Sequence, residues 1–320
     1  MLEQNKKINS IVLLRAIAAL AVCFIHIQMA TGFQINPFFD YLFINGQQGV
    51  VIFFVISGFI LPYSLFKKQY QIKNFFGFIL KRSVRVDPPY WCCIILLFIL
   101  VPLPLSALNL KSIFLHLAYL VPFIKSVNWY SGIFWTLSIE FQFYIILGLL
   151  YPVLMWLQNY ISVLIVIFLS VLSIKYNING IIISNVYQFA FGYIAFMAYV
   201  KLIDRKWFWI IFLLFTTYII FAKSIISGVV PASAVSFLML YKRNTNVPVL
   251  NFLGNISYSL YLMHIPISAI AIRTLSGSLK NTGLLFLICL ILSILIAYIF
   301  YLLIERPALN LSKRINLRKR

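Results

Sequence analysis

The sequence predicts an all-α protein, a polytopic transmembrane helix bundle of about ten spans with both termini in the cytoplasm. Of its 320 residues, 63% are hydrophobic and only 10% are charged, whereas a soluble domain is about 25% charged. Apolar stretches recur along the whole chain, and basic residues gather between alternate stretches. The aromatic share of 17% also excludes a disordered chain.

A membrane-crossing helix needs about 20 mostly apolar residues, and ten stretches approach that length. In chain order they are 11–30, 47–66, 89–105, 133–156, 160–175, 181–200, 207–222, 225–241, 249–271 and 282–304. The segment 108–124 fits an interfacial helix, a re-entrant segment or an extra span equally well. No linker or repeat divides the chain, so residues 1–320 are predicted to form a single integral-membrane domain.

The charge distribution predicts the orientation. The chain has 26 Lys and Arg against 6 Asp and Glu, a formal net charge of +20. With a cytoplasmic N-terminus, 20 of the 26 basic residues fall in inner segments, as the positive-inside rule requires. We therefore attribute the basic charge to orientation and to contact with membrane lipids, and expect no nucleic-acid partner.

The four cysteines are predicted to be buried thiols. Cys23, Cys92, Cys93 and Cys289 all lie in apolar runs, and neither a CxxC motif nor a Cys/His metal spacing accompanies them. We expect no metal site and no permanently bound cofactor.

Arg15 and His26 in the first span form the first candidate site, because an ionisable side chain inside a bilayer is costly. They are 11 residues apart, which places them within about 20° around a helix and about 16 Å along it. This shared face suits a long ligand with its anionic end at Arg15 and its reactive end at His26. Taken singly, a snorkelling Arg and a packed His are the ordinary explanations.

Glu140 lies within another span and is one of only six acids in the chain. A desolvated carboxylate needs a partner, and we expect it to be His26 or Arg15. Ser138 and Tyr144 are spaced to share a polar stripe with it, although Tyr144 also fits an interfacial anchor. A purely structural ion pair is the alternative explanation for Glu140.

Arg82 and Arg85 lie three residues apart and would face the same way on a helix end. Two guanidinium groups on one side form a good clamp for phosphate groups. Positive-inside charge is the simpler explanation. Pro88 and Pro89 follow directly and are expected to break the helix and restart the next span.

Two further stretches carry polar residues at membrane depth. Ser257, Tyr261 and His264 recur at i, i+4 and i+7, so one helix face is polar, with His264 as a second acid/base, an acceptor-orienting group or a structural histidine. In the second span, Ser57 is followed by Gly58, which is expected to allow close helix approach. His116, in the ambiguous segment 108–124, is expected to be structural.

Together these segments resemble the bacterial membrane acyltransferase family 3, the integral-membrane O-acyltransferases that modify cell-surface glycans. The resemblance rests on the order of its elements: Arg15 to His26, Gly49 to Phe59, Arg82-Ser83-Val84-Arg85 with Pro88 and Tyr90, Trp135 to Tyr144, Ser257 to His264, and Ile304-Glu305-Arg306-Pro307. Val51 departs from the pattern, since the family often places an acid there. With no soluble esterase-like domain attached, the chain resembles the stand-alone form.

The resemblance implies a multi-pass enzyme of the bacterial cytoplasmic (inner) membrane. Its donor would be cytoplasmic acyl-CoA, usually acetyl-CoA, and its acceptor a hydroxyl of a carbohydrate such as lipopolysaccharide or another surface polysaccharide. Arg15, Arg82 and Arg85 would bind the acyl-CoA. His26 would act as general base or as nucleophile, and Glu140 would orient His26 or bind the acceptor. The acceptor or supporting residues would be Ser57, Ser138, Tyr144, Tyr261 and His264.

A transporter or flippase for a glycan or lipid precursor fits the composition equally well. Such a protein would move its substrate without forming any covalent product. This alternative does not explain the arginine pair, Arg82 and Arg85. A non-catalytic assembly partner of glycan machinery is a weaker alternative, which predicts that His26 and Glu140 are dispensable. The acceptor sugar, the acyl group and the oligomeric state are not predicted.

Overall fold

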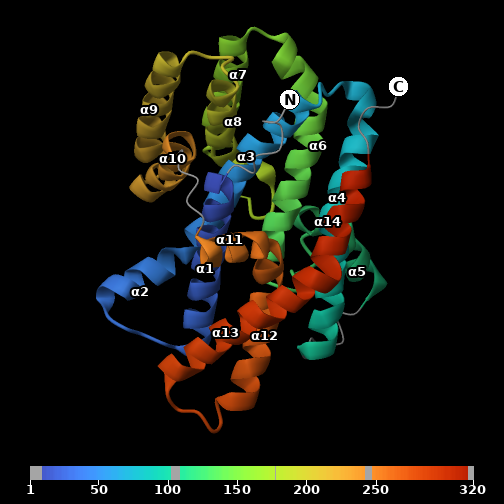
Figure 1. The fold of residues 1–320 in the computed structure, drawn as a ribbon, viewed down its shortest axis with the longest axis vertical. Helices are drawn as coiled ribbons and strands as arrows, with labels where there is room; N and C mark the ends of the chain where they lie inside the picture. Colours follow the sequence, from blue (N-terminus) through green and yellow to red (C-terminus); the bar gives the residue numbers. More distant parts are fainter. Residues whose placement is uncertain (1–8, 102–108, 177, 242–246, 316–320) are drawn as a thin grey trace.

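The computed structural model describes residues 9–101, 109–176, 178–241 and 247–315, and every regular element within those ranges is helical (Figure 1). The helices are α1 (Asn9–Thr31), α2 (Pro37–Ile44), α3 (Gln48–Lys67), α4 (Phe75–Leu100), α5 (Leu110–Leu117), α6 (Phe134–Trp156), α7 (Asn159–Ser173), α8 (Val186–Tyr199), α9 (Arg205–Ala222), α10 (Ile225–Leu240), α11 (Pro248–Asn255), α12 (Ser257–Leu275), α13 (Thr282–Phe300) and α14 (Arg306–Arg314). The all-α prediction is therefore confirmed.

Six helical stretches in the described residues are long and apolar enough to cross a membrane. They are Asn9–Thr31, Pro37–Lys67, Ile72–Leu100, Phe134–Trp156, Arg205–Ala222 and Thr282–Arg314. The pair α11 and α12, bent by 74°, makes a seventh if it is one broken span. The predicted segments 160–175, 181–200 and 225–241 form helices of only 15, 14 and 16 residues.

Nine of the ten predicted segments each overlap one α-helix, although 102–105 of the third lie outside the described residues, and 249–271 covers the two helices α11 and α12. The structure supports six or seven spans by length and composition. The count of ten and the cytoplasmic termini remain predictions.

Helix α1 lies at the centre of the bundle and packs against α3, α11, α12 and α13. Figure 1 shows α7 to α10 gathered at one side, with α8 against α3, and α12 and α13 at the opposite end. Helix α1 is apolar nearly all round, as a helix buried within a bundle should be. The two polar side chains that it presents to α12 therefore lie inside the bundle.

Helices α3 and α8 approach each other closely at two glycines. A Cβ added at Gly58 would lie 2.2 Å from the Phe189 carbonyl oxygen, and one added at Gly192 would lie 2.1 Å from the Val55 carbonyl oxygen. Each glycine thus sits on the backbone of the other helix. The predicted role of Gly58 in close helix approach is confirmed.

Substituting either glycine is expected to force these helices apart. Gly58→Ala and Gly192→Ala should each lower the free energy of unfolding by about 1–3 kcal/mol, because the clashing atoms are backbone and cannot move aside. Thermal unfolding in detergent measures this. Gly132→Ala is the matched control, since a Cβ there meets nothing within 4 Å. Equal melting temperatures for all three variants would contradict the packing.

The prediction that Pro88 and Pro89 break the helix is wrong. Both residues lie inside α4, which runs unbroken from Phe75 to Leu100. Prolines are tolerated in membrane helices when neighbouring groups satisfy the freed backbone. The carbonyls that lose their helical N–H partner here are those of Val84 and Arg85, four residues before each proline. The Tyr258 hydroxyl of α12 donates to the neighbouring Val86 carbonyl at 2.9 Å, so α12 contacts α4 at the proline pair.

The segment 108–124 does not form a further crossing helix in its described part, 109–124. It consists of α5 and a short 3-10 turn, Val121–Phe123, and packs against the middle of α4. The Tyr90 hydroxyl donates to the His116 carbonyl at 3.1 Å, and the Tyr119 hydroxyl donates to Asp87 at 2.9 Å. These contacts tie the segment to α4, and the choice between an interfacial and a re-entrant segment stays a prediction.

His116 itself is fully buried. Its Nδ1 donates to the Ser112 carbonyl at 2.8 Å, and its Nε2 accepts the Tyr130 N–H at 3.0 Å. The His116 imidazole also stacks on the Tyr130 ring, with the ring centroids 3.6 Å apart. Because Nε2 accepts a backbone N–H, it carries no hydrogen of its own, and the ring is neutral. The predicted structural role is borne out by these contacts.

Candidate active site

A cavity of about 410 Å³ opens between α1, α3, α4, α6 and α12. It follows one face of α3, whose lining residues recur every three or four positions from Val50 to Lys67. The helix advances about 26 Å along its axis from Val50 to Lys67. The cavity is therefore long and narrow, with a Lys67 end and a Val50 end.

Basic side chains gather toward the Lys67 end of the cavity. Five cations line it, Arg15, Lys67, Lys68, Arg82 and Arg85, against two acids, Glu140 and Glu305. In the described residues none of the five forms an ion pair with a carboxylate. An excess of unpaired cations around a partly enclosed space favours an anionic ligand.

Arg82 is the most buried of these cations, with only 9% of its surface exposed. Its Nε atom is buried and has no hydrogen-bond partner in the described part of the chain. The guanidinium lies 5.5 Å from the Phe78 ring centroid and 5.9 Å from that of Tyr144. Because a buried donor without a partner is costly, this geometry suits a ligand that supplies acceptor oxygens.

Glu140 faces the same cavity from α6. Its Oε1 accepts the Tyr144 hydroxyl at 2.7 Å and the Ser57 hydroxyl at 3.2 Å. These contacts differ from the predicted partners, because neither His26 nor Arg15 hydrogen-bonds the carboxylate. Helical spacing along α6 correctly placed Tyr144 beside Glu140. The contact with Ser57 was not predicted, because Ser57 lies on another helix, α3.

The predicted common face of α1 is confirmed by its contacts with a single partner helix, α12. Arg15 Nε donates to Ser257 Oγ at 3.0 Å. Eleven residues further along α1, His26 Nδ1 lies 3.0 Å from His264 Nε2. Arg15 and His26 therefore meet Ser257 and His264 of the polar α12 face, which the i, i+4, i+7 pattern indicated.

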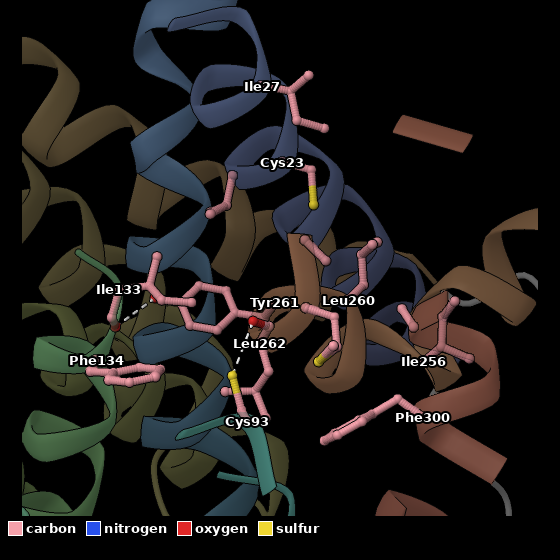
Figure 2. Packing of buried hydrophobic residues seen from close by; sticks show 14 of the residues in the cluster. Cys23, Ile27, Cys93, Ile133, Phe134, Ile256, Leu260, Tyr261, Leu262 and Phe300 are labelled. Atoms are coloured by element: carbon pink, nitrogen blue, oxygen red, sulfur yellow. Dashed lines mark hydrogen bonds between the residues drawn. The ribbon is translucent and has the colours of Figure 1, made fainter. Parts of the chain in front are cut away.

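His26, however, does not line the cavity. The Val50 end is closed by Phe53, Thr136 and Tyr261, and the Tyr261 ring centroid is 6.0 Å from those of Phe53 and His264. Figure 2 shows the Tyr261 ring directed toward Ile133, whose carbonyl accepts its hydroxyl at 3.2 Å. The Tyr261 and Thr136 hydroxyls are 2.7 Å apart. Tyr261 thus stands between the cavity and the histidine pair.

The structure brings most of the predicted site residues together. Those that line the cavity are Arg15, Ser57, Arg82, Arg85, Glu140, Tyr144 and Tyr261. His26 and His264 form a pair beyond its Val50 end. Ser138 lies apart, because its hydroxyl donates to the Tyr119 carbonyl at 2.9 Å and accepts from Gln142 at 3.1 Å, which ties α6 to the segment 109–124.

Glu305 is the main lining residue that residue patterns did not single out. It sits in a π-helical turn, Tyr301–Glu305, between α13 and α14, and π-helical turns often occur at functional sites. Its Oε2 accepts the backbone N–H of Ser259 at 3.0 Å and the Ser259 hydroxyl. The carboxylate thereby caps the first turn of α12. The same helix carries both Ser257 and His264.

The arrangement combines an anion-binding region with a pair of imidazoles about one helical turn beyond its far end. In the described residues no group of three His, Cys, Asp or Glu is placed to hold a metal ion. An imidazole beside a long cationic cavity is suited to proton transfer or nucleophilic attack on a ligand whose anionic part is held elsewhere.

Comparison with known proteins gives one match. The sequence model of a family described as an acyltransferase domain matches residues 8–302. No curated protein and no solved structure matches the chain. The matched range includes the cavity's arginines, the histidine pair and the π-helical turn as far as residue 302.

Proposed function

Since this chain belongs to acyltransferase family 3, whose model matches residues 8–302, we propose that it transfers an acyl group, most often acetyl, from cytoplasmic acyl-CoA to a hydroxyl of a surface or lipid-linked glycan. The single observation that carries the proposal is the cavity, in which unpaired cations at one end are joined by a narrow passage to the neighbourhood of His26. With multiple apolar helices and this family, the chain is a multi-pass membrane protein. We place it in the bacterial inner membrane.

The donor would bind with its nucleotide phosphates at Arg82 and Arg85. Guanidinium groups bind phosphate oxygens in a forked geometry, and the buried Arg82 Nε has no hydrogen-bond partner among the described residues. The uncharged pantetheine arm would follow the face of α3 past Arg15 toward Phe53 and Tyr261. A narrow passage about 26 Å long suits such an extended chain with its thioester at the far end.

His26 would act at the thioester as a general base. Its Nε2 takes the proton of the acceptor hydroxyl, the alkoxide oxygen attacks the thioester carbonyl, and the carbon–sulfur bond breaks to release CoA thiolate. The proton on Nε2 then passes to the thiolate, which completes an ester and free CoA. Because Tyr261 stands between the cavity and the histidines, its contact with Thr136 has to open before the acyl group reaches His26.

Glu140 would act through the charge of the cavity, since its hydrogen bonds go to Ser57 and Tyr144. Glu140→Gln keeps the shape but removes one negative charge among the arginines. At about 10 Å and an effective dielectric constant of about 20, that charge is worth about 1.7 kcal/mol, a factor of about 10–20 in affinity. The KM for acetyl-CoA is therefore expected to fall roughly tenfold, and turnover to fall because CoA leaves more slowly.

Steady-state kinetics of the purified protein measures both effects. Ser57→Ala, which removes one hydrogen bond to the carboxylate and keeps its charge, is the matched comparison and should leave the donor KM near its original value. A donor KM that rises in Glu140→Gln would show that the carboxylate contributes to donor binding directly.

Mass spectrometry of surface glycans from cells with and without the gene tests the proposed function. A mass difference of one acyl unit, together with CoA release by the purified protein, supports it. Identical glycans and vectorial movement of an unmodified glycan precursor would instead favour a flippase.

A further inference from the structure

His26 and His264 form a pair whose hydrogen bonds determine where the protons lie. His26 Nδ1 is 2.9 Å from the Val22 carbonyl oxygen and 3.0 Å from His264 Nε2. His264 Nδ1 is 3.1 Å from the Leu260 carbonyl oxygen. The ring centroids are 5.1 Å apart and the planes are inclined by 37°.

Only one arrangement of protons satisfies all three contacts. A carbonyl oxygen can only accept, so both Nδ1 atoms must carry a hydrogen. Neutral His264 then has a lone pair on Nε2, and this lone pair faces the Nδ1–H of His26, a single hydrogen that His26 shares between His264 Nε2 and the Val22 carbonyl. The opposite assignment would set lone pairs of both rings against carbonyl oxygens. The Nε2 atom of His26 is left without a hydrogen, and no described residue hydrogen-bonds it.

We propose that His264 is the positioning residue of His26: its Nε2 accepts the Nδ1–H of His26, orients the ring and leaves Nε2 of His26 as the basic atom that meets the acceptor hydroxyl. This inference rests on the proposed function. In the proton transfer described above, His26 becomes an imidazolium once Nε2 has taken the hydroxyl proton. The Nδ1–H of that imidazolium makes a stronger, charge-assisted hydrogen bond to His264 Nε2, while His264 keeps its own proton.

His264 is suited to this role and to no direct one. Its side chain is fully buried. Nε2, its only ring nitrogen without a hydrogen, points at His26 rather than at the cavity. In the described part of the chain neither ring hydrogen-bonds a carboxylate, the usual partner of a catalytic histidine. A neutral imidazole accepts the same hydrogen bond without placing a negative charge inside the bundle, where it would be costly.

Nitrogen NMR of the resting protein tests the proton arrangement. The chain has only three histidines, so ¹⁵N-histidine labelling gives three rings that single substitutions assign. We expect His26 and His264 both to be neutral and protonated at Nδ1. A His26 ring protonated at Nε2 alone, or a His264 ring protonated at Nε2, would overturn the proposal.

Kinetics tests the consequence for transfer. His264→Leu fills the space without an acceptor and is expected to lower kcat roughly 100-fold with the donor KM unchanged. His264→Gln restores an acceptor oxygen near the Nε2 position and should recover activity to within about tenfold of the original. The matched control is Ser268→Ala, which should leave kcat unchanged. Ser268 lies one turn beyond His264 on α12, and its hydroxyl donates only to the Ile265 carbonyl.

The outcomes separate the two proposals. If the unsubstituted protein forms no ester with any acyl-CoA, the proposed function fails, whereas the nitrogen shifts still decide the proton arrangement. If it is active and His264→Leu keeps full kcat, or His264→Gln is as impaired as His264→Leu, the positioning role is refuted.

Discussion

His26→Gln is expected to abolish acyl transfer while the protein still inserts at normal abundance. The substitution removes the basic Nε2 atom, and general-base catalysis of this kind contributes about 10²–10⁴-fold to the rate. Glutamine retains a donor for the Val22 carbonyl, which His26 Nδ1 bonds at 2.9 Å, so packing should be preserved. Ester formation and CoA release by the purified variant measure the effect.

His116→Ala provides the contrasting control, because His116 is fully buried outside the cavity and the histidine pair, with both ring nitrogens hydrogen-bonded. The Tyr130 N–H, which His116 Nε2 accepts at 3.0 Å, then loses its partner at a cost of about 1–3 kcal/mol. This variant should lose thermal stability and keep its activity per folded molecule. Full activity of His26→Gln would refute the catalytic assignment.

Trapping separates the two roles considered for His26. When radiolabelled acetyl-CoA is added without acceptor and the reaction is stopped with acid, a general base leaves the protein unlabelled. Label that depends on His26 would instead indicate an acyl-imidazole intermediate. We expect no label.

Arg82→Gln and Arg85→Gln should each raise the KM for acetyl-CoA by about 10–100-fold, and the double substitution should raise it further. Hydrogen bonds to charged groups are worth about 1.5–3 kcal/mol each. Each substitution would remove the hydrogen bonds between one guanidinium group and the donor phosphates. Arg205→Gln is the control, since Arg205 begins α9 and does not line the cavity. It should bind the donor normally.

A truncated donor makes this test specific. Acetyl-pantetheine lacks the nucleotide phosphates, so Arg82→Gln and Arg85→Gln should not weaken its use any further. The two changes, one in the protein and one in the donor, would therefore be strongly non-additive. Additive losses would show that the arginines act elsewhere than on the nucleotide.

The sequence predicted those features that depend on one helix at a time. Apolar length located all ten helical segments, and helical spacing placed Arg15 with His26 on one face and Ser257 with His264 on another. The all-α class, the membrane character and the family follow from these patterns and are confirmed.

Features that arise between helices were not predictable in this way. No period along α1 shows that His26 meets His264, 238 positions away, and no local pattern shows that Ser57 rather than His26 binds Glu140. The continuation of α4 through Pro88 and Pro89, and the contact of Tyr258 of α12 with the Val86 carbonyl beside them, follow from packing between helices. The inward position of Glu305 depends on a π-helical turn, which shifts the register that a regular helix would have.

The most direct test of the account is a sided assay in sealed proteoliposomes. The protein is oriented so that its Arg82 side faces the lumen, with labelled acetyl-CoA inside and the glycan acceptor outside. We predict labelled ester on the external acceptor, formed only with donor inside and lost in His26→Gln. Ester formed equally well with both substrates on one side, or transfer that persists without His26, would contradict the claim that the bundle passes an acyl group from a cationic cavity to an imidazole facing the other side.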